Sequence, residues 1–249
     1  MKNSTNAESR LQAEIQCLGK RKDAIYALVR TTRTAGEKTV LVIALVSTKG
    51  GSGKSLLAEC LAVHAAGLGK SVFLVDVDPQ QSSAAWWRRR KGPDNPLLIT
   101  GRGSAIRAFK EVYARKAERD VAIIDTPGSD IAVIDRTILA ADRVVVVAQP
   151  SIKDLEAQGV VAELIARADR VKSTLYVVNR APARSMLGRN AAEVLQRRSP
   201  HPPVIVADRV AYVNADAAGQ TGNEIDTKAE REIAALWDAI ERMGNGKAG

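Results

Sequence analysis

Residues 46–55 read Val-Ser-Thr-Lys-Gly-Gly-Ser-Gly-Lys-Ser and lie between an apolar run and a segment of helical pattern. The glycines allow backbone N–H groups to converge on one point, and the N-terminus of the following helix adds positive potential there. Lys54 is placed to reach the terminal phosphates of a nucleotide, and Ser55 to ligate Mg²⁺. Strand, loop and helix together predict a phosphate-binding loop rather than an ordinary glycine-rich turn.

The loop departs from the common pattern G-x-x-x-x-G-K-[ST] at one position. That pattern requires glycine at position 48, where the sequence has Thr48, and a second lysine, Lys49, stands directly before Gly50. A turn would accept almost any residue at this position. The additional charge therefore suggests a separate role for Lys49, toward a nucleotide held by another subunit.

Apolar runs alternate with helical patterns on the C-terminal side of this loop. Strands are predicted at 40–46, 72–77, 97–100, 121–125, 143–148, 175–179 and 204–207, and helices at 56–68, 80–91, 105–118, 131–141, 154–168, 191–198 and 228–243. Short links between strand and helix favour an α/β fold, a mainly parallel twisted sheet with helices on both faces, as in P-loop NTPases. We expect three regions: a basic amphipathic helical extension at 1–38, a P-loop domain at 39–243 and a flexible tail at 244–249.

Two acidic segments follow predicted strands. Residues 75–80 read Val-Asp-Val-Asp-Pro-Gln, and residues 123–128 read Ile-Ile-Asp-Thr-Pro-Gly. Both place carboxylates at C-terminal strand ends, the edge of the sheet where the phosphate loop lies. Asp125 is a Walker-B-type aspartate in this pattern, expected to hold Mg²⁺ through its water shell.

Composition narrows the class of protein further. The 249 residues include 37 Lys and Arg against 28 Asp and Glu, a formal net charge of +9, which favours an anionic partner. Two cysteines are too few for a disulfide framework, and Cys60 in an apolar helical pattern is expected to be buried. No apolar run approaches the roughly 20 residues of a membrane span. We therefore expect a cytoplasmic protein without membrane attachment.

Three motifs carry a resemblance to a known family. Residues 49–55, 76–80 and 125–128 resemble the deviant Walker A, switch I and Walker B/switch II motifs of the ParA/MinD ATPases. Val178-Asn-Arg180, residues 208–213 and Ala218-Gly219 resemble short ParA-type partition proteins more loosely. The resemblance covers about residues 39–243.

The resemblance implies a homodimer that sandwiches two ATP molecules with Mg²⁺. It assigns catalytic roles to Lys49, Lys54, Asp78 and Asp125, with Lys49 reaching the partner's nucleotide and Asp78 positioning the attacking water. It assigns ATP binding to Lys49, Gly50, Gly51, Ser52, Gly53, Lys54, Ser55, Asn179 and Arg180. Ser55, Asp76 and Asp125 are implied at the metal, the aspartates through water.

The positive charge is concentrated in two stretches. Residues 86–119 hold ten basic and three acidic side chains, and residues 167–209 hold nine and three. Such stretches favour sequence-independent binding to the DNA backbone. We expect Arg180, Arg184, Arg189 and Arg209 to contact DNA because they match the family region. Trp86 and Trp87 could stack on bases, although such a pair more often divides between core and surface.

The sequence thus predicts a nucleoid-associated ATPase for partitioning of plasmid or chromosomal DNA. Its partners would be nonspecific DNA and a ParB-like centromere-binding adaptor that stimulates hydrolysis. Two alternatives remain: a MinD-like positioning ATPase and a conjugation-associated ParA-like protein. A MinD-like protein would end in a basic amphipathic helix, whereas residues 228–243 carry mixed charge.

Overall fold

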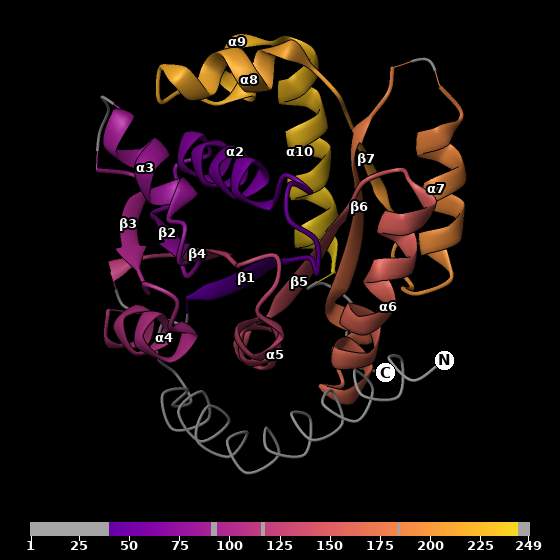
Figure 1. Cartoon of the computed structure of the whole chain (residues 1–249). Coiled ribbons are helices and arrows are strands. Elements are labelled where there is room, and N and C mark those ends of the chain that lie inside the picture. Colours follow the sequence, from indigo (N-terminus) through magenta and orange to yellow (C-terminus); the bar gives the residue numbers. More distant parts are fainter. Residues whose placement is uncertain (1–39, 91–93, 116–117, 184, 244–249) are drawn as a thin grey trace.

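A seven-stranded parallel sheet forms the centre of the protein (Figure 1). The computed structural model describes residues 40–90, 94–115, 118–183 and 185–243. The strand order is β3-β2-β4-β1-β5-β6-β7, and every neighbouring pair is parallel. The strands are β1 (Leu41–Val46), β2 (Val72–Asp76), β3 (Leu97–Thr100), β4 (Val121–Asp125), β5 (Arg143–Ala148), β6 (Thr174–Ala181) and β7 (Val204–Ala207).

Helices cover both faces of the sheet (Figure 1). One face carries α2 (Lys54–Gly67), α3 (Ser82–Arg89), α8 (Val210–Ala217), α9 (Gly222–Ile225) and α10 (Thr227–Arg242). The other face carries α4 (Ala105–Ala114), α5 (Ile131–Ala140), α6 (Ile152–Arg167) and α7 (Leu187–Gln196). Successive β1 residues point into opposite cores, Val42 and Ala44 into one and Ile43 and Leu45 into the other. This burial on both faces explains the uninterrupted apolar run in the sequence.

The predicted fold class is confirmed, and each predicted strand and helix is present. Helices α8 and α9 were not predicted, because α8 buries only Tyr212 and Ala215 and therefore leaves little apolar periodicity. Helix α7 begins at Leu187 rather than at residue 191, since Leu187 is exposed and does not continue the buried pattern. The expected extension at 1–38 and the tail at 244–249 lie outside the described residues.

The core contains the aromatic and sulfur side chains that the sequence places in it. Trp86 and Trp237 are fully buried, as is Cys60, which confirms the expectation for that residue. Helix α10 directs Ile233, Leu236, Trp237 and Ile240 into the core. Within the described ranges, no helix is long and apolar enough to cross a membrane.

Candidate nucleotide-binding site

The glycine-rich loop connects β1 to α2 and owes its shape to two glycines. Gly51 and Gly53 adopt φ values of +75° and +92°, a left-handed backbone that favours glycine. A Cβ atom at Gly53 would also lie 2.1 Å from Nδ2 of Asn179. Helix α2 begins at the next residue, Lys54, so its first backbone N–H groups face the end of the loop.

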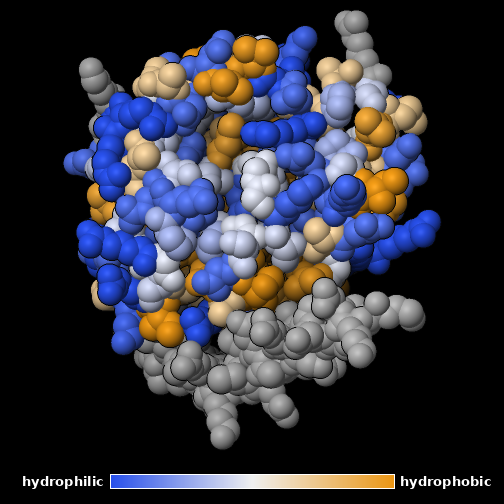
Figure 2. Space-filling view, viewed as in Figure 1, coloured by the Kyte–Doolittle hydropathy of each residue, from blue (hydrophilic) through white to orange (hydrophobic). Residues whose placement is uncertain are grey.

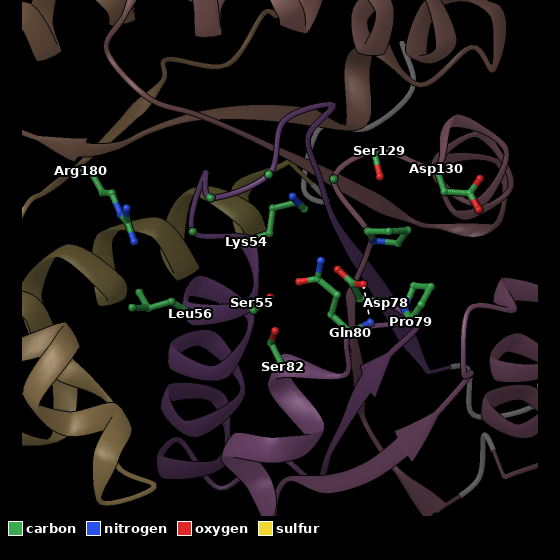
Figure 3. Close-up of a pocket in the computed structure, with 15 residues that line it drawn as sticks. Lys54, Ser55, Leu56, Asp78, Pro79, Gln80, Ser82, Ser129, Asp130 and Arg180 are labelled. Carbon is green, nitrogen blue, oxygen red and sulfur yellow. Dashed lines mark hydrogen bonds between the residues drawn. The ribbon is translucent and has the colours of Figure 1, made fainter.

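A cavity of about 680 Å³ opens over this loop (Figure 3). Its lining comes from four segments that are distant in sequence: 50–56, 78–82, 127–130 and Arg180. Figure 3 shows Lys54, Ser55, Asp78 and Arg180 around one space. A cavity of this size and mixed polarity suits a small phosphorylated ligand.

Lys54 lies on the floor of the cavity. Its Nζ atom is 3.3 Å from the Lys49 carbonyl oxygen and 3.4 Å from Ser52 Oγ, and the side chain is buried. Burial lowers the pKa of Lys54, while the carboxylates of Asp125 and Asp78 oppose that shift. An anionic phosphate at this position would stabilise the ammonium form that burial disfavours.

Asp76 and Asp125 lie side by side at the ends of neighbouring strands β2 and β4. Both are fully buried, and burial together with the charge of Asp76 raises the pKa of Asp125 to about 7. Oδ2 of Asp125 accepts a hydrogen bond from Ser83 Oγ at 2.9 Å, whereas its Oδ1 has no partner among the described residues. This buried, unpaired carboxylate oxygen near Ser55 fits a hydrated divalent cation, which would satisfy Oδ1 and favour the charged form.

Asp76 supports the segment that follows β2. Its Oδ1 accepts a hydrogen bond from the Asp78 N–H at 3.0 Å, and its Oδ2 accepts one from the Ala84 N–H at 2.9 Å. Burial raises the pKa of Asp76, and these two backbone donors oppose that shift. Asp76 thus holds both ends of the turn that presents Asp78 to the cavity, and Oδ1 of Asp78 accepts from the Gln80 N–H at 2.9 Å (Figure 3).

Lys49 contacts a residue of α6 that belongs to none of the sequence motifs. Its Nζ atom lies 2.5 Å from Oδ2 of Asp154 in the first turn of α6, and Ser151 Oγ donates to the same oxygen at 2.6 Å. The Asp154 side chain is buried, whereas that of Lys49 is 45% exposed. Ser151 and Asp154 form an N-terminal capping pattern in the sequence, but nothing in that pattern indicates Lys49 as a partner.

Asn179 and Arg180 lie where the pairing of β6 with β7 shifts register. This bulge separates their side chains. Asn179 is buried and donates from Nδ2 to the Ser52 carbonyl oxygen at 2.8 Å, so it braces the glycine-rich loop. Arg180 has a left-handed φ of +53°, is exposed and lines the cavity (Figure 3).

Two further residues border the acidic pair. Ser83 at the start of α3 donates to Asp125, and Glu59 of α2 is buried beside Ser83. Burial and the nearby charge of Asp125 raise the pKa of Glu59 to about 9, so this carboxyl is protonated at neutral pH. Neither residue belongs to a local motif, because only the packing of α2 and α3 on the sheet brings them to Asp125.

The four arginines expected to contact DNA do not share one environment. Arg209 is held by Glu232 of α10 at 2.5 Å, Arg180 lines the nucleotide cavity, and Arg189 is exposed on α7. Arg184 lies outside the described residues. Trp86 is not available for base stacking, because its ring is fully buried and its Nε1 donates to the Gln220 carbonyl oxygen at 2.9 Å, whereas Trp87 is only partly buried.

A parallel α/β sheet with a phosphate loop after β1 and buried aspartates at neighbouring strand ends defines a P-loop nucleotide-binding protein. The lysine directly before Gly50 places it in the deviant Walker A class. The chain belongs to the CobQ/CobB/MinD/ParA nucleotide-binding domain family, whose model matches residues 43–222. Its fold is that of the ParA/MinD-type ATPases.

Individual relatives agree with this membership. The chain is 24% identical over 214 residues to protein ParA of Rhizobium radiobacter, covering 80% of this chain and 92% of the relative. It is similar in fold to the ATP complex of a Cyanothece McdA variant, with a TM-score of 0.67, 16% identity and coverage of 82% and 98%. The Mg-ADP complex of the septum site-determining protein MinD from Pyrococcus horikoshii gives a TM-score of 0.63, 17% identity and coverage of 85% and 98%.

Proposed function

We propose that the chain is a ParA-like ATPase that partitions DNA, with residues 39–243 forming its ATPase domain. ATP-bound dimers would bind DNA without sequence preference, and a ParB-like centromere-binding adaptor would stimulate hydrolysis and release. The observation that carries the proposal is the cavity that joins Lys54, Ser55 and Asp78, beside Asp125 with its unpaired oxygen. The ParA relative of similar length supports the assignment to DNA partitioning.

The residues around the cavity suit ATP hydrolysis. Backbone N–H groups of residues 50–55 would bind the phosphates, and Lys54 would neutralise their charge. Ser55 directly, and Asp125 with Asp76 through water, would hold Mg²⁺, which neutralises phosphate charge when bound. Asp78, anchored by Asp76 and the Gln80 N–H, would orient the attacking water.

Lys49 supplies the link between hydrolysis and dimerisation. In the structure it binds Asp154 of its own chain, so it must leave that partner to reach a nucleotide in the other protomer. A γ-phosphate on the partner's ATP would offer a competing anion. Dimerisation would then depend on ATP because Lys49 exchanges its internal ion pair with Asp154 for the phosphate of the partner's nucleotide.

Both switch segments contact the phosphate loop or the acidic pair, which supports nucleotide-dependent rearrangement. A Cβ atom at Gly128 would lie 2.8 Å from the Gly50 nitrogen, so the segment after β4 rests directly on the loop. Asp76 holds the segment after β2 through the Asp78 and Ala84 N–H groups. Ordering by a γ-phosphate and release on hydrolysis would thus reach both segments.

A MinD-like positioning function is less well supported. Helix α10 uses its apolar face in the core and presents mixed charge to solvent, whereas a membrane-binding helix requires a free apolar face. A conjugation-associated relative would share the same ATPase core.

The proposal is tested by DNA binding in three nucleotide states. A fluorescent duplex of random sequence is titrated with protein in ATP, in ADP and without nucleotide, and ATP hydrolysis is measured in parallel with and without Mg²⁺. We expect binding in ATP only and Mg²⁺-dependent hydrolysis. Equal binding in all three states would overturn the proposed switch.

A further inference from the structure

The structure divides the basic residues of the 86–119 stretch into two groups. Arg89 pairs with Asp216 at 2.9 Å, Arg90 with Glu224 at 2.8 Å and Arg115 with Glu118 at 2.8 Å. Arg89 and Arg90 fasten α3 to the α8–α9 segment, and Arg115 neutralises Glu118 beyond α4 and Glu111 on α4. By contrast, Arg88 of α3 is exposed and unpaired among the described residues, and so are three cations that follow β3: Arg102, Arg107 and Lys110.

Three of these cations, Arg102, Arg107 and Lys110, come from the one segment that runs from the end of β3 into α4, and we call them the β3–α4 basic patch. Arg102 lies in the loop between β3 and α4, and Arg107 and Lys110 are three residues apart on α4. Residues at this spacing are neighbours on one helix face. The first turn of α4 contains no acidic residue, so the positive end of the helix adds to the same potential. Figure 2 shows that hydrophilic side chains predominate along the left edge of the molecule, with some hydrophobic ones among them.

Arg102 adopts a left-handed backbone conformation, which is unfavourable for any residue with a side chain. Its φ is +46°, between Gly101 and Gly103, in a turn where glycine would be the least strained residue. A long charged side chain at such a position destabilises the turn without any internal contact to offset it among the described residues. Gln81, Asp169 and Arg180 adopt the same region, so the backbone of Arg102 agrees with a role outside folding but does not by itself define one.

The exposed side chains around the patch indicate which class of partner it can bind. None of the large exposed apolar side chains lies in the described parts of residues 86–119. The rival basic surface on α7 differs, because Met186, Leu187 and Val194 are 58%, 52% and 44% exposed beside its arginines. A membrane-binding surface needs apolar groups to insert, whereas a DNA backbone needs only positive charge. The β3–α4 patch therefore fits nucleic acid phosphates, and the α7 surface fits an amphipathic partner.

The patch is also joined to switch I. The Gly101 N–H donates to the Asp76 carbonyl oxygen at 2.7 Å, and a Cβ atom at Gly103 would lie 3.2 Å from Cγ of Pro79. The loop that carries Arg102 therefore packs on the segment that presents Asp78 to the nucleotide. A movement of switch I would displace Arg102 directly.

We propose that the β3–α4 basic patch is the surface through which the ATP-bound protein holds the phosphate backbone of double-stranded DNA. The proposal rests on the proposed function and replaces the arginines of the 180–209 region as its main DNA contacts. Each protomer contributes three cations, and the contact between the 101–103 loop and switch I makes the position of Arg102 depend on the bound nucleotide. Charge alone makes the contact, so binding is independent of sequence and strongly dependent on salt.

The test compares two triple variants of the full chain with matched charge. One is Arg102→Gln/Arg107→Gln/Lys110→Gln, and the other, which removes three exposed cations from the rival basic stretch at 167–209, is Lys172→Gln/Arg189→Gln/Arg197→Gln. Binding to a random duplex is measured in ATP and in ADP at several salt concentrations, and thermal melting verifies folding. Loss of three phosphate contacts per protomer should reduce the slope of log affinity against log salt by about 2.7 for each protomer in contact with DNA. The rival variant should keep the unmodified slope.

The outcomes separate the two levels of the argument. If the unmodified protein does not bind DNA in ATP, the proposed function fails and the patch proposal falls with it. If it binds and the patch variant keeps the same slope, the patch proposal alone is overturned. The same result follows if the patch variant loses binding to anionic phosphatidylserine vesicles while its binding to DNA is unchanged.

A second variant distinguishes function from structure at one residue. Arg102→Gly should raise the melting temperature, because glycine accepts the left-handed turn, and at the same time weaken DNA binding in ATP. A higher melting temperature with unchanged DNA affinity would contradict a DNA-binding role for Arg102.

Discussion

Removing the ion pair between Lys49 and Asp154 should strengthen the ATP-dependent dimerisation of the protein. In Asp154→Asn the carboxylate that holds Lys49 in the single chain becomes a neutral amide of nearly the same shape. The helix-terminal position of Asp154 affects monomer and dimer alike, so that contribution cancels. What changes is the free energy needed to release Lys49 from its own chain.

The size of the effect follows from the surroundings of the pair. The two charged atoms are 2.5 Å apart and Asp154 is buried, which strengthens the attraction, but Lys49 is 45% exposed to screening water. A partly exposed pair of this type contributes about 1 kcal/mol. The dimer must release two such pairs, so the variant should dimerise about 30-fold more tightly, equivalent to about 2 kcal/mol.

Sedimentation velocity with a non-hydrolysable ATP analogue measures this dimerisation constant. Glu156→Gln is the matched control, because Glu156 is exposed on the same helix and loses the same charge without contacting Lys49. Lys49→Ala should abolish ATP-dependent dimerisation. An Asp154→Asn protein that dimerises as weakly as the unmodified chain, or more weakly, would refute the competition between Asp154 and the partner's nucleotide.

Three other predictions concern the nucleotide site. Gly53→Ala should destabilise the protein by more than about 1 kcal/mol and abolish nucleotide binding, because the φ of Gly53 is +92° and the added methyl would overlap Asn179. Urea denaturation measures the loss of stability, and titration with an ATP analogue measures the loss of nucleotide binding. Ser83→Ala should cost about 1–3 kcal/mol by leaving Oδ2 of Asp125 without its donor, and saturating Mg²⁺ with nucleotide should recover part of the loss; a loss that Mg²⁺ and nucleotide leave undiminished would count against this role. The pKa of Glu59 is about 9 in the folded chain and about 4.5 in the unfolded chain, so the contribution of Glu59 to stability declines as pH rises from about 4.5 to 9. Glu59→Gln should therefore be more stable than the unmodified protein at pH 8. Denaturation curves from pH 5 to 9 should show a smaller decline in stability for this variant. A decline of the same slope in the Glu59→Gln protein would show that other groups cause it.

Local chemistry let the sequence indicate most of the site. The glycines and Lys54 of the phosphate loop, and the aspartates at strand ends, are recognisable because each role depends on residues next to one another in the chain. The strands could be predicted equally well from the sequence, since burial on both faces leaves uninterrupted apolar runs. Short α8 and α9 escaped prediction because they bury too few side chains to leave a period.

The tertiary structure decided how distant residues combine. Asp154 reaches Lys49, Ser83 and Glu59 reach Asp125, and Asn179 reaches Ser52 only after helices and strands far apart in sequence have packed together. The same holds for charge. The sequence determined that residues 86–119 are strongly basic, but only the fold showed which arginines are paired internally and which remain exposed for an anionic partner, because ion pairing depends on distances that the order of residues does not contain.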